Sequence, residues 1–180
     1  MKTQAARHTI GTLTAAVFAA AIFALAAPAA RAADLPKLMV FDTEFHDLMM
    51  SGTGESFTTA EDVSRAKTVS DMFRKELAGH YQIITPKKDA DPYDLSCPEC
   101  ILKVAKDQGA ALVLTSALSR MNSRNVYLKY ELGDVAKNER LAGGNIQLNG
   151  YTARQINMAT NNAVKDLLTN GGGEKAAAPK

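Results

Sequence analysis

Cys97-Pro98-Glu99-Cys100 is the segment whose residue types and spacing most clearly permit chemistry. The chain has 180 residues and two cysteines, and both cysteines lie in this segment. In an oxidising compartment the two thiols would form a structural disulfide, and closing a loop of about four residues contributes only about 2 kcal/mol. Alternatively the pair is redox-active, because a helix N-terminus lowers the pKa of a thiol and this spacing allows disulfide exchange.

The residues around the cysteine pair exclude other uses of a CxxC segment. Haem attachment needs a histidine directly after the second cysteine, where Ile101 stands. A zinc site needs a second pair of ligands, which the sequence does not provide. Thioredoxin-like proteins join the pair directly to a long strand, whereas a polar segment ending in Leu95-Ser96 precedes it here. The structural and the redox-active disulfide therefore remain as the two alternatives.

Asp42, Glu44 and His46 form a second candidate site at the end of an apolar run. If a strand continues through them, all three lie on one face at its carboxyl end, where open α/β sheets bind ligands. Such a group could hold a divalent metal or place an acid beside a base. Alternatively, Asp42 caps the following turn or binds backbone amides. Met49 and Met50 add thioethers that suit copper, although methionines in loops also simply pack.

Other polar residues carry weaker signals. His80 follows Gly79 at a helix end, where a polar or cationic residue is ordinary. A basic strip or a solvated sheet face would both explain four cations in the second half of the chain: Arg120, Arg124, Lys129 and Arg140. Sequence motifs of serine hydrolases, zinc proteases, P-loop proteins and dinucleotide-binding proteins do not occur. The sequence therefore predicts no cofactor and favours a non-catalytic protein, without deciding against an enzyme.

The first 32 residues have the pattern of a cleavable secretory signal peptide. Basic residues near the start precede an apolar stretch over residues 10–27, and Ala30-Arg31-Ala32 then offers a processing site. The alternative is an uncleaved N-terminal anchor for the same domain. No cysteine stands at the processing site, so we expect no lipid anchor. We therefore expect a periplasmic protein of a Gram-negative bacterium, with no membrane span after cleavage.

Removal of residues 1–32 leaves 18 Lys and Arg against 19 Asp and Glu, which is a formal charge of −1. A nearly neutral domain has no overall field that would draw it to nucleic acid. The domain boundaries follow from the pattern. We expect a short lead over residues 33–36, one domain over residues 37–170 and a tail of Gly, Ala and Lys over residues 171–180.

Capping patterns and helical periodicity predict three helices. Thr58 and Thr59 with Glu61 and Asp62 form the first capping box. The inward face of that helix is then Val63, Ala66, Val69, Met72, Phe73 and Leu77. Ser96 with Glu99 predicts a second capping box, before a helix with Ile101, Val104 and Ala105 inward. Thr152 and Gln155 predict the cap of the last helix, whose inward residues are Ile156, Ala159, Ala163, Val164 and Leu167.

Apolar runs and alternation predict five strands, over residues 37–45, 81–85, 111–118, 126–132 and 141–148. Gly143-Gly144 predicts a bulge in the last of them. The resulting order is β-α-β-α-β-β-β-α. Crossover helices after the first two strands imply a parallel core of three strands, to which a meander adds antiparallel strands. We therefore expect one mixed α/β (α+β) domain with a five-stranded sheet and helices packed on it.

Three segments resemble an uncharacterised family of proteobacterial exported proteins, a domain of unknown function. They are Phe-Asp-Thr-Glu at residues 41–44, Asp-Met-Phe-Arg-Lys-Glu-Leu at residues 71–77, and the run from Cys97 to Thr115. More distantly, the arrangement is similar to the amino-terminal domain of TolB and to CsgG-like envelope proteins. In those proteins a "gly-ala-asp" phrase precedes an apolar strand, and Ala111 replaces the Asp here.

The resemblance implies an adaptor or assembly role in the bacterial envelope, in some members beside a periplasmic quinoprotein-type oxidation system. It implies no catalytic residues. Our first expectation is therefore a non-catalytic accessory domain that binds an envelope or periplasmic protein. A thiol–disulfide protein that uses Cys97 and Cys100 is the first alternative. A carrier of a metal or small ligand that uses Asp42, Glu44 and His46 is the second.

Overall fold

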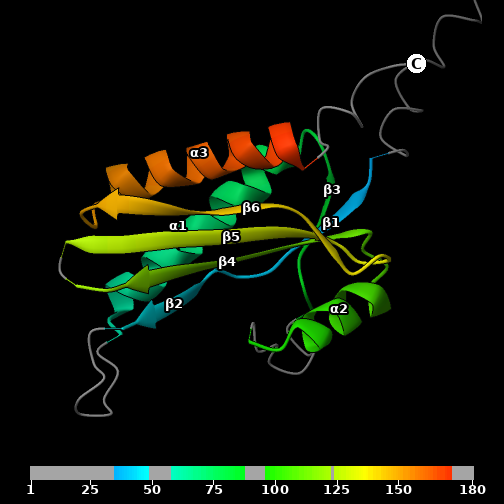
Figure 1. Cartoon of the computed structure of the whole chain (residues 1–180), viewed down its shortest axis with the longest axis horizontal. Coiled ribbons are helices and arrows are strands. Elements are labelled where there is room, and N and C mark those ends of the chain that lie inside the picture. Colours follow the sequence, from blue (N-terminus) through cyan, green and yellow to red (C-terminus); the bar gives the residue numbers. More distant parts are fainter. Residues whose placement is uncertain (1–34, 49–57, 88–95, 123, 172–180) are drawn as a thin grey trace, which may run out of the picture. The chain divides into compact units, whose positions relative to one another are not determined.

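The computed structural model describes residues 35–48, 58–87, 96–122 and 124–171. These residues form one six-stranded sheet and three helices (Figure 1). The elements are β1 (Lys37–Val40), β2 (Glu44–Asp47), α1 (Ala60–Leu77), β3 (Gln82–Ile84), α2 (Pro98–Asp107), β4 (Leu112–Arg120), β5 (Asn125–Asp134), β6 (Glu139–Asn149) and α3 (Ala153–Asn170). None of the described helices has the length and hydropathy that a membrane span requires.

The sheet has the strand order β3-β1-β4-β5-β6, and β2 also pairs with β4. The strands β1, β2 and β3 run parallel to their partners, whereas β5 and β6 are antiparallel. The mixed α/β fold, with its parallel core and antiparallel meander, is therefore confirmed. The sheet has six strands instead of five because the predicted first strand is broken into β1 and β2, which pair with successive parts of β4.

A buried network of hydroxyl groups accompanies this break. Thr43 lies between β1 and β2, and its N–H donates to Ser70 Oγ on α1 at 2.7 Å. The hydroxyl of Thr43 also lies 2.8 Å from that of Ser116 on β4. All three residues are buried. Because buried polar groups need hydrogen-bond partners, this network stabilises the break and ties it to both α1 and β4.

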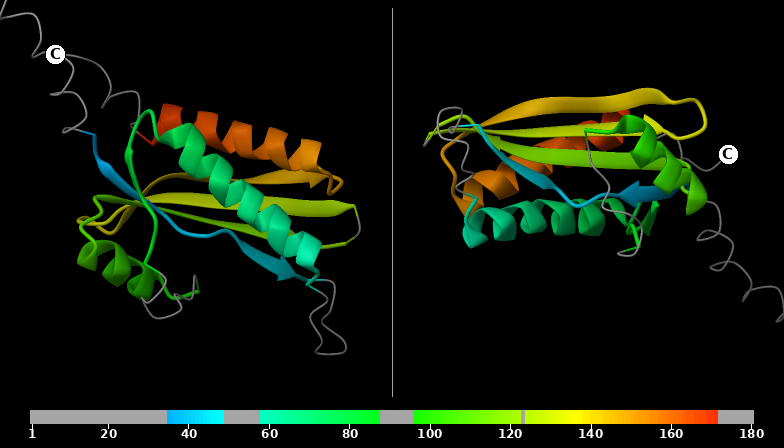
Figure 2. Two further views of the ribbon diagram at one scale, coloured as in Figure 1. Left: turned by 180° about the vertical axis from the view of Figure 1, so that it is seen from behind. Right: turned by 90° about the horizontal axis from the view of Figure 1, so that it is seen from below.

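The helices cover the two faces of the sheet unequally. Figures 1 and 2 show α1 and α3 side by side on one face and α2 on the other. The larger apolar core lies beneath α1 and α3, and a smaller one lies beneath α2. Most of the predicted inward face of α1 is buried, but Met72 is only partly buried and Val63 is 58% exposed, so the prediction for Val63 was wrong. The five inward residues predicted for α3 are all buried.

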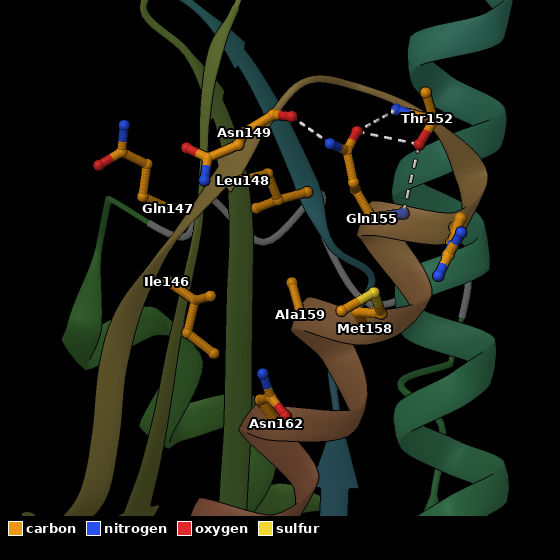
Figure 3. A pocket seen from close by; sticks show the side chains of 10 residues that line it. Ile146, Gln147, Leu148, Asn149, Thr152, Gln155, Met158, Ala159 and Asn162 are labelled. Atoms are coloured by element: carbon orange, nitrogen blue, oxygen red, sulfur yellow. Dashed lines mark hydrogen bonds between the residues drawn. The ribbon is translucent and has the colours of Figure 1, made fainter.

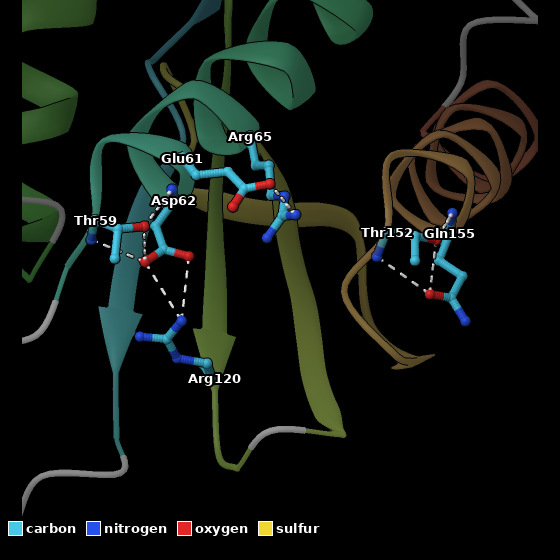
Figure 4. Close-up of polar contacts among 7 residues, drawn as sticks. All are labelled: Thr59, Glu61, Asp62, Arg65, Arg120, Thr152 and Gln155. Carbon is cyan, nitrogen blue, oxygen red and sulfur yellow. Dashed lines mark hydrogen bonds and ion pairs between the residues drawn. The ribbon is translucent and has the colours of Figure 1, made fainter.

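Two of the three predicted helix caps are confirmed. Thr59 with Asp62 and Thr152 with Gln155 form complete capping boxes (Figure 4). The capping box predicted at Ser96 and Glu99 was wrong, because α2 begins one residue later with Cys97 as its N-cap. Pro98 takes the first helical position, which proline favours because its ring fixes a helical φ and that position needs no N–H donor.

The bulge in β6 lies beside the predicted glycines. Leu132 pairs with Ala142 and Gly133 with Arg140, so Leu141 is the extra residue and the prediction of a bulge at Gly143-Gly144 was wrong. The two glycines pair regularly with β5 and allow Tyr130 to approach closely. A Cβ at Gly143 would lie 2.6 Å from the carbonyl oxygen of Tyr130, and one at Gly144 would lie 2.7 Å from its hydroxyl.

Candidate functional site

A groove of about 690 Å³ lies on the α2 side of the sheet. Strands β2, β4 and β5, the start of α2 and the β5–β6 hairpin line it. Figures 1 and 2 show that α2 lies against one end of this face, and that β2 and the far parts of β4 and β5 extend beyond it. Pro98, Ile101 and Leu102 of α2 border one end of the groove, and the floor beyond them is a sheet surface that no described helix covers.

Strand alternation places the side chains of the groove. In β5, Val126, Leu128, Tyr130 and Leu132 are buried in the larger core. Because successive side chains point to opposite faces, Lys129 and Glu131 must lie on the groove side. Both line the groove. The alternation that buries one face of β5 therefore also builds the polar face opposite.

The groove carries charges of both signs. Its acidic side chains are Glu44, Glu131, Asp134 and Glu139, and its cationic ones are Lys129 and Arg140. Ala117 pairs with Glu44 on one side and with Lys129 on the other, so opposite charges flank a small apolar residue. His46 also lines the groove, and its Nε2 lies 3.0 Å from Glu44 Oε2. This pattern can recognise a polar or charged surface of a ligand.

The break between β1 and β2 separates the three residues of the predicted acid–histidine site. Glu44 and His46 face the groove, whereas Asp42 Oδ1 lies 2.5 Å from Arg74 Nη2 on α1, which packs on the opposite face. Among the described residues, no group of three His, Cys, Asp or Glu side chains could hold a metal ion. Met49 and Met50 lie outside the described residues.

Cys97 and Cys100 form a disulfide with their Cα atoms 5.3 Å apart. The flanking residues Ser96 and Pro98 line the groove, so the disulfide lies at its edge. Cys100 is exposed, and its N–H donates to the Sγ atom of Cys97 at 3.3 Å. The bridge agrees with the sequence prediction, and its redox activity remains a prediction. A sulfur atom that accepts a helix N–H is in a position that stabilises a thiolate.

The four cations of the predicted basic strip have different environments. Lys129 and Arg140 line the groove among carboxylates, and Arg124 is exposed at the turn before β5. Arg120 lies away from the groove and donates to Asp47 at 2.5 Å and to Asp62 at 3.2 Å. His80 is half-buried just after α1 and forms no part of the groove.

Arg120 holds three elements together, a role that sequence reasoning missed. It joins the end of β4 to Asp47 in β2 and to Asp62 in the first turn of α1, and Figure 4 shows the Asp62 contact. Burial raises the pKa of Asp62, but the hydrogen bonds from Thr59 and the charge of Arg120 outweigh burial and hold that pKa below its usual range. The sequence did contain a signal for this contact. Asp62 caps the helix and lies on its inward face, where a carboxylate needs a partner.

Among solved structures, the chain is similar to the LpoB C-terminal domain from Salmonella enterica (18% identity, 63% of this chain and 82% of that chain, TM-score 0.43). It is also similar to the PelC dodecamer from Paraburkholderia phytofirmans (14%, 82% and 91%, 0.46) and to TolB from Acinetobacter baumannii (14%, 76% and 29%, 0.43). At these identities and TM-scores, the similarities carry no argument about function.

No curated protein matches the chain. A family model does match it, over residues 36–168, and its description is "Protein of unknown function (DUF2380)". This span includes every described helix and strand except the last two residues of α3. The chain therefore belongs to this family.

Proposed function

We propose that this protein is an exported, non-catalytic binding domain whose groove holds part of a protein partner. The observation that carries the proposal is the uncovered sheet face, where β2, β5 and the start of β6 present charges of both signs on a rigid surface. Binding sites placed on strands keep their geometry better than sites on loops. Paired opposite charges around Ala117 favour a partner surface with its own complementary charges.

Two observations support export to an oxidising compartment. The pattern of residues 1–32 is that of a secretory signal, and the two cysteines are joined in a disulfide. A periplasmic location and an adaptor role in the envelope agree with the family resemblance. The most specific version of this proposal is association with a quinoprotein-type oxidation system, and it rests on that resemblance alone.

Site-specific photo-crosslinking in the cells that make the protein tests the binding proposal. A photoreactive residue replaces Lys129 in the groove, and the matched control replaces Lys67, which is exposed on α1. We expect a discrete crosslinked partner from position 129 and none from position 67. Identical products from both positions would reject the groove as the binding site. Turnover by the purified protein alone in a broad activity screen would reject the non-catalytic role.

The disulfide supports a second candidate function, that of a thiol–disulfide protein. Cys100 is exposed and Cys97 is the N-cap of α2, which is the position where a thiolate is stabilised. The reduction potential decides between the alternatives. A value between about −120 and −270 mV would place the pair among exchange catalysts, whereas a value well below about −300 mV indicates a structural bridge. Reductase and isomerase activities that do not change in the Cys97→Ser, Cys100→Ser double variant would reject this function.

The third candidate function is that of a carrier of a metal or small ligand. It would rest on Glu44 and His46, since Asp42 contacts Arg74 instead. Two side chains leave most positions of a metal ion to the ligand or to solvent. Metal analysis of the isolated protein, before and after incubation with divalent copper or zinc, tests this function. The absence of stoichiometric metal in both samples would reject it.

A further inference from the structure

The edges of the sheet differ in how they are protected against pairing with another strand. On one side, β3 has three residues and Pro86 follows it closely, and β2 has four residues of which three are Glu44, His46 and Asp47. Short strands, prolines and charged side chains all discourage edge-to-edge pairing. On the other side, β6 has eleven residues, and those from Leu141 to Asn149 include neither a charge nor a proline. A bulge at Leu141 and the charges of Glu139 and Arg140 protect only the start of β6, so its edge from Ala142 to Asn149 carries neither the charges nor the proline of the opposite edge.

The backbone of β6 presents hydrogen-bonding groups along this edge. Gly150 N–H donates to the carbonyl oxygen of Arg124, its direct partner in the ladder, so the even-numbered residues of β6 bond to β5. The N–H and C=O groups of Asn145 and Gln147 must then point outward. None of the described strands pairs with that side of β6. Gln155 donates to the carbonyl oxygen of Asn149 and so occupies only the far end of the edge.

A second groove, of about 420 Å³, runs between this edge and α3 (Figure 3). Leu148 and Ala159 are buried at its base, while Ile146 is half-buried and Met158 is 56% exposed. A strand that paired with β6 would direct alternate side chains toward α3. Those side chains would meet Ile146 and Met158, so apolar residues fit there.

The charge beside this groove indicates the chemistry of the occupant. Arg154 is the one charged residue among those that line the groove. The first turn of α3 contains no acidic residue, whereas that of α1 contains Glu61 and Asp62. A carboxylate on the ligand would therefore meet Arg154, with no acid among the residues that line the groove or in the first turn of α3. A second copy of β6 would bring no carboxylate over residues 141–149, so charge complementarity favours a different chain.

We propose that the edge of β6 binds an extended acidic segment of a partner protein by strand addition beside α3. The segment pairs with the backbone of Asn145 and Gln147, places apolar side chains against Ile146 and Met158, and directs a carboxylate toward Arg154. This mode takes affinity from the main chain and specificity from alternate side chains. The surface is separate from the groove beside α2, which lies on the other face of the sheet.

Selection from a random library of displayed peptides of about ten residues tests the proposal with the purified protein as bait. The enriched peptides are then synthesised and titrated by calorimetry. The key variant is Gln147→Pro, which removes an outward N–H without breaking a bond to β5. Gln147→Ala is its matched control, because both variants lose the contact between the Gln147 side chain and Asn125.

We expect enriched peptides to alternate apolar residues and to carry Asp, Glu or a free C-terminal carboxylate. Gln147→Pro should bind them at least about tenfold more weakly than Gln147→Ala, and Arg154→Glu should lose a similar factor. Lys67→Ala, at an exposed position on α1, should bind them like the unaltered protein. Equal affinity for Gln147→Pro and Gln147→Ala, or no enriched peptide, would overturn the proposal. A dimer that Gln147→Pro dissociates would also overturn it, because the occupant would then be a second copy.

Discussion

The two faces of the sheet differ in how much of each is buried. Beneath α1 and α3, residues such as Phe73, Leu114 and Leu128 are completely buried in one continuous core. On the α2 side, a smaller core occupies one end, and small, polar and charged side chains line the groove beside it. Burial of apolar area is the main source of folding free energy, so most of the stability should come from the first face. The second face is then free to present charges that a core could not accept.

The largest effect on stability is expected for a substitution in the core beneath α1 and α3. Phe73→Ala removes a completely buried aromatic side chain on α1 and should lower the free energy of unfolding by about 3 to 5 kcal/mol. Equilibrium unfolding in urea measures this change. Val63→Ala is the control on the same helix, because Val63 is mostly exposed and its loss should cost less than about 0.5 kcal/mol. Similar losses in both variants would contradict the assignment of the core to this face.

Arg120→Met tests the ion pairs that join the end of β4 to β2 and to α1. It leaves the buried carboxylates of Asp47 and Asp62 without their shared cation. Breaking a buried pair costs about 3 to 5 kcal/mol, and we expect about 2 to 4 because the Arg120 side chain is partly exposed. The loss should be measured by urea unfolding at neutral pH, with Arg124→Met, at an exposed turn, as the control.

The stabilities of the unaltered protein and of Arg120→Met should depend differently on pH. The pKa of Asp62 is held below its usual range in the folded protein, in part by Arg120. Its contribution to stability is therefore present above the unfolded pKa, near pH 4, and is lost as the pH falls through the folded value. The difference in unfolding free energy between the unaltered protein and Arg120→Met should narrow as the pH falls from 7 toward 3. A constant difference would mean that Arg120 acts only through packing.

Local patterns were sufficient to predict most of the fold. The strict alternation of residues 126–132 assigned a buried and a polar face to β5, and hydroxyl residues followed by Asp or Gln located two helix starts. Each of these signals is contained within a few neighbouring residues. The same alternation could also have predicted that Lys129 and Glu131 lie together on the groove side.

Features that depend on distant residues could not be predicted in this way. The break at Thr43 is accompanied by hydrogen bonds to Ser70 and Ser116, which lie 27 and 73 positions away. The sequence around Thr43 therefore indicated one continuous strand, and so grouped Asp42 with Glu44 and His46. The misplaced cap of α2 is different, because Pro98 was a local signal for the first helical position.

A smaller effect on stability is expected for loss of the disulfide at the edge of the groove beside α2. Replacing both Cys97 and Cys100 by serine should lower the unfolding free energy by about 1 to 3 kcal/mol, because the bridge closes a very short loop. The fold should survive, as circular dichroism would show. Free thiols in protein isolated from an oxidising compartment would contradict the bridge. A loss well above this range would mean that the bridge supports more of the structure than the start of α2.

The smallest effect on stability is expected for the charges in the groove. Lys129 is exposed, and Ala117 separates it from Glu44 in the register of the sheet. Lys129→Ala should therefore change the unfolding free energy by less than about 0.5 kcal/mol. If the groove binds a partner, the same substitution should reduce partner capture by several-fold, whereas Lys67→Ala on α1 should change neither quantity. A loss of stability without a loss of capture would show that these charges maintain the sheet, and the division between the two faces would then fail.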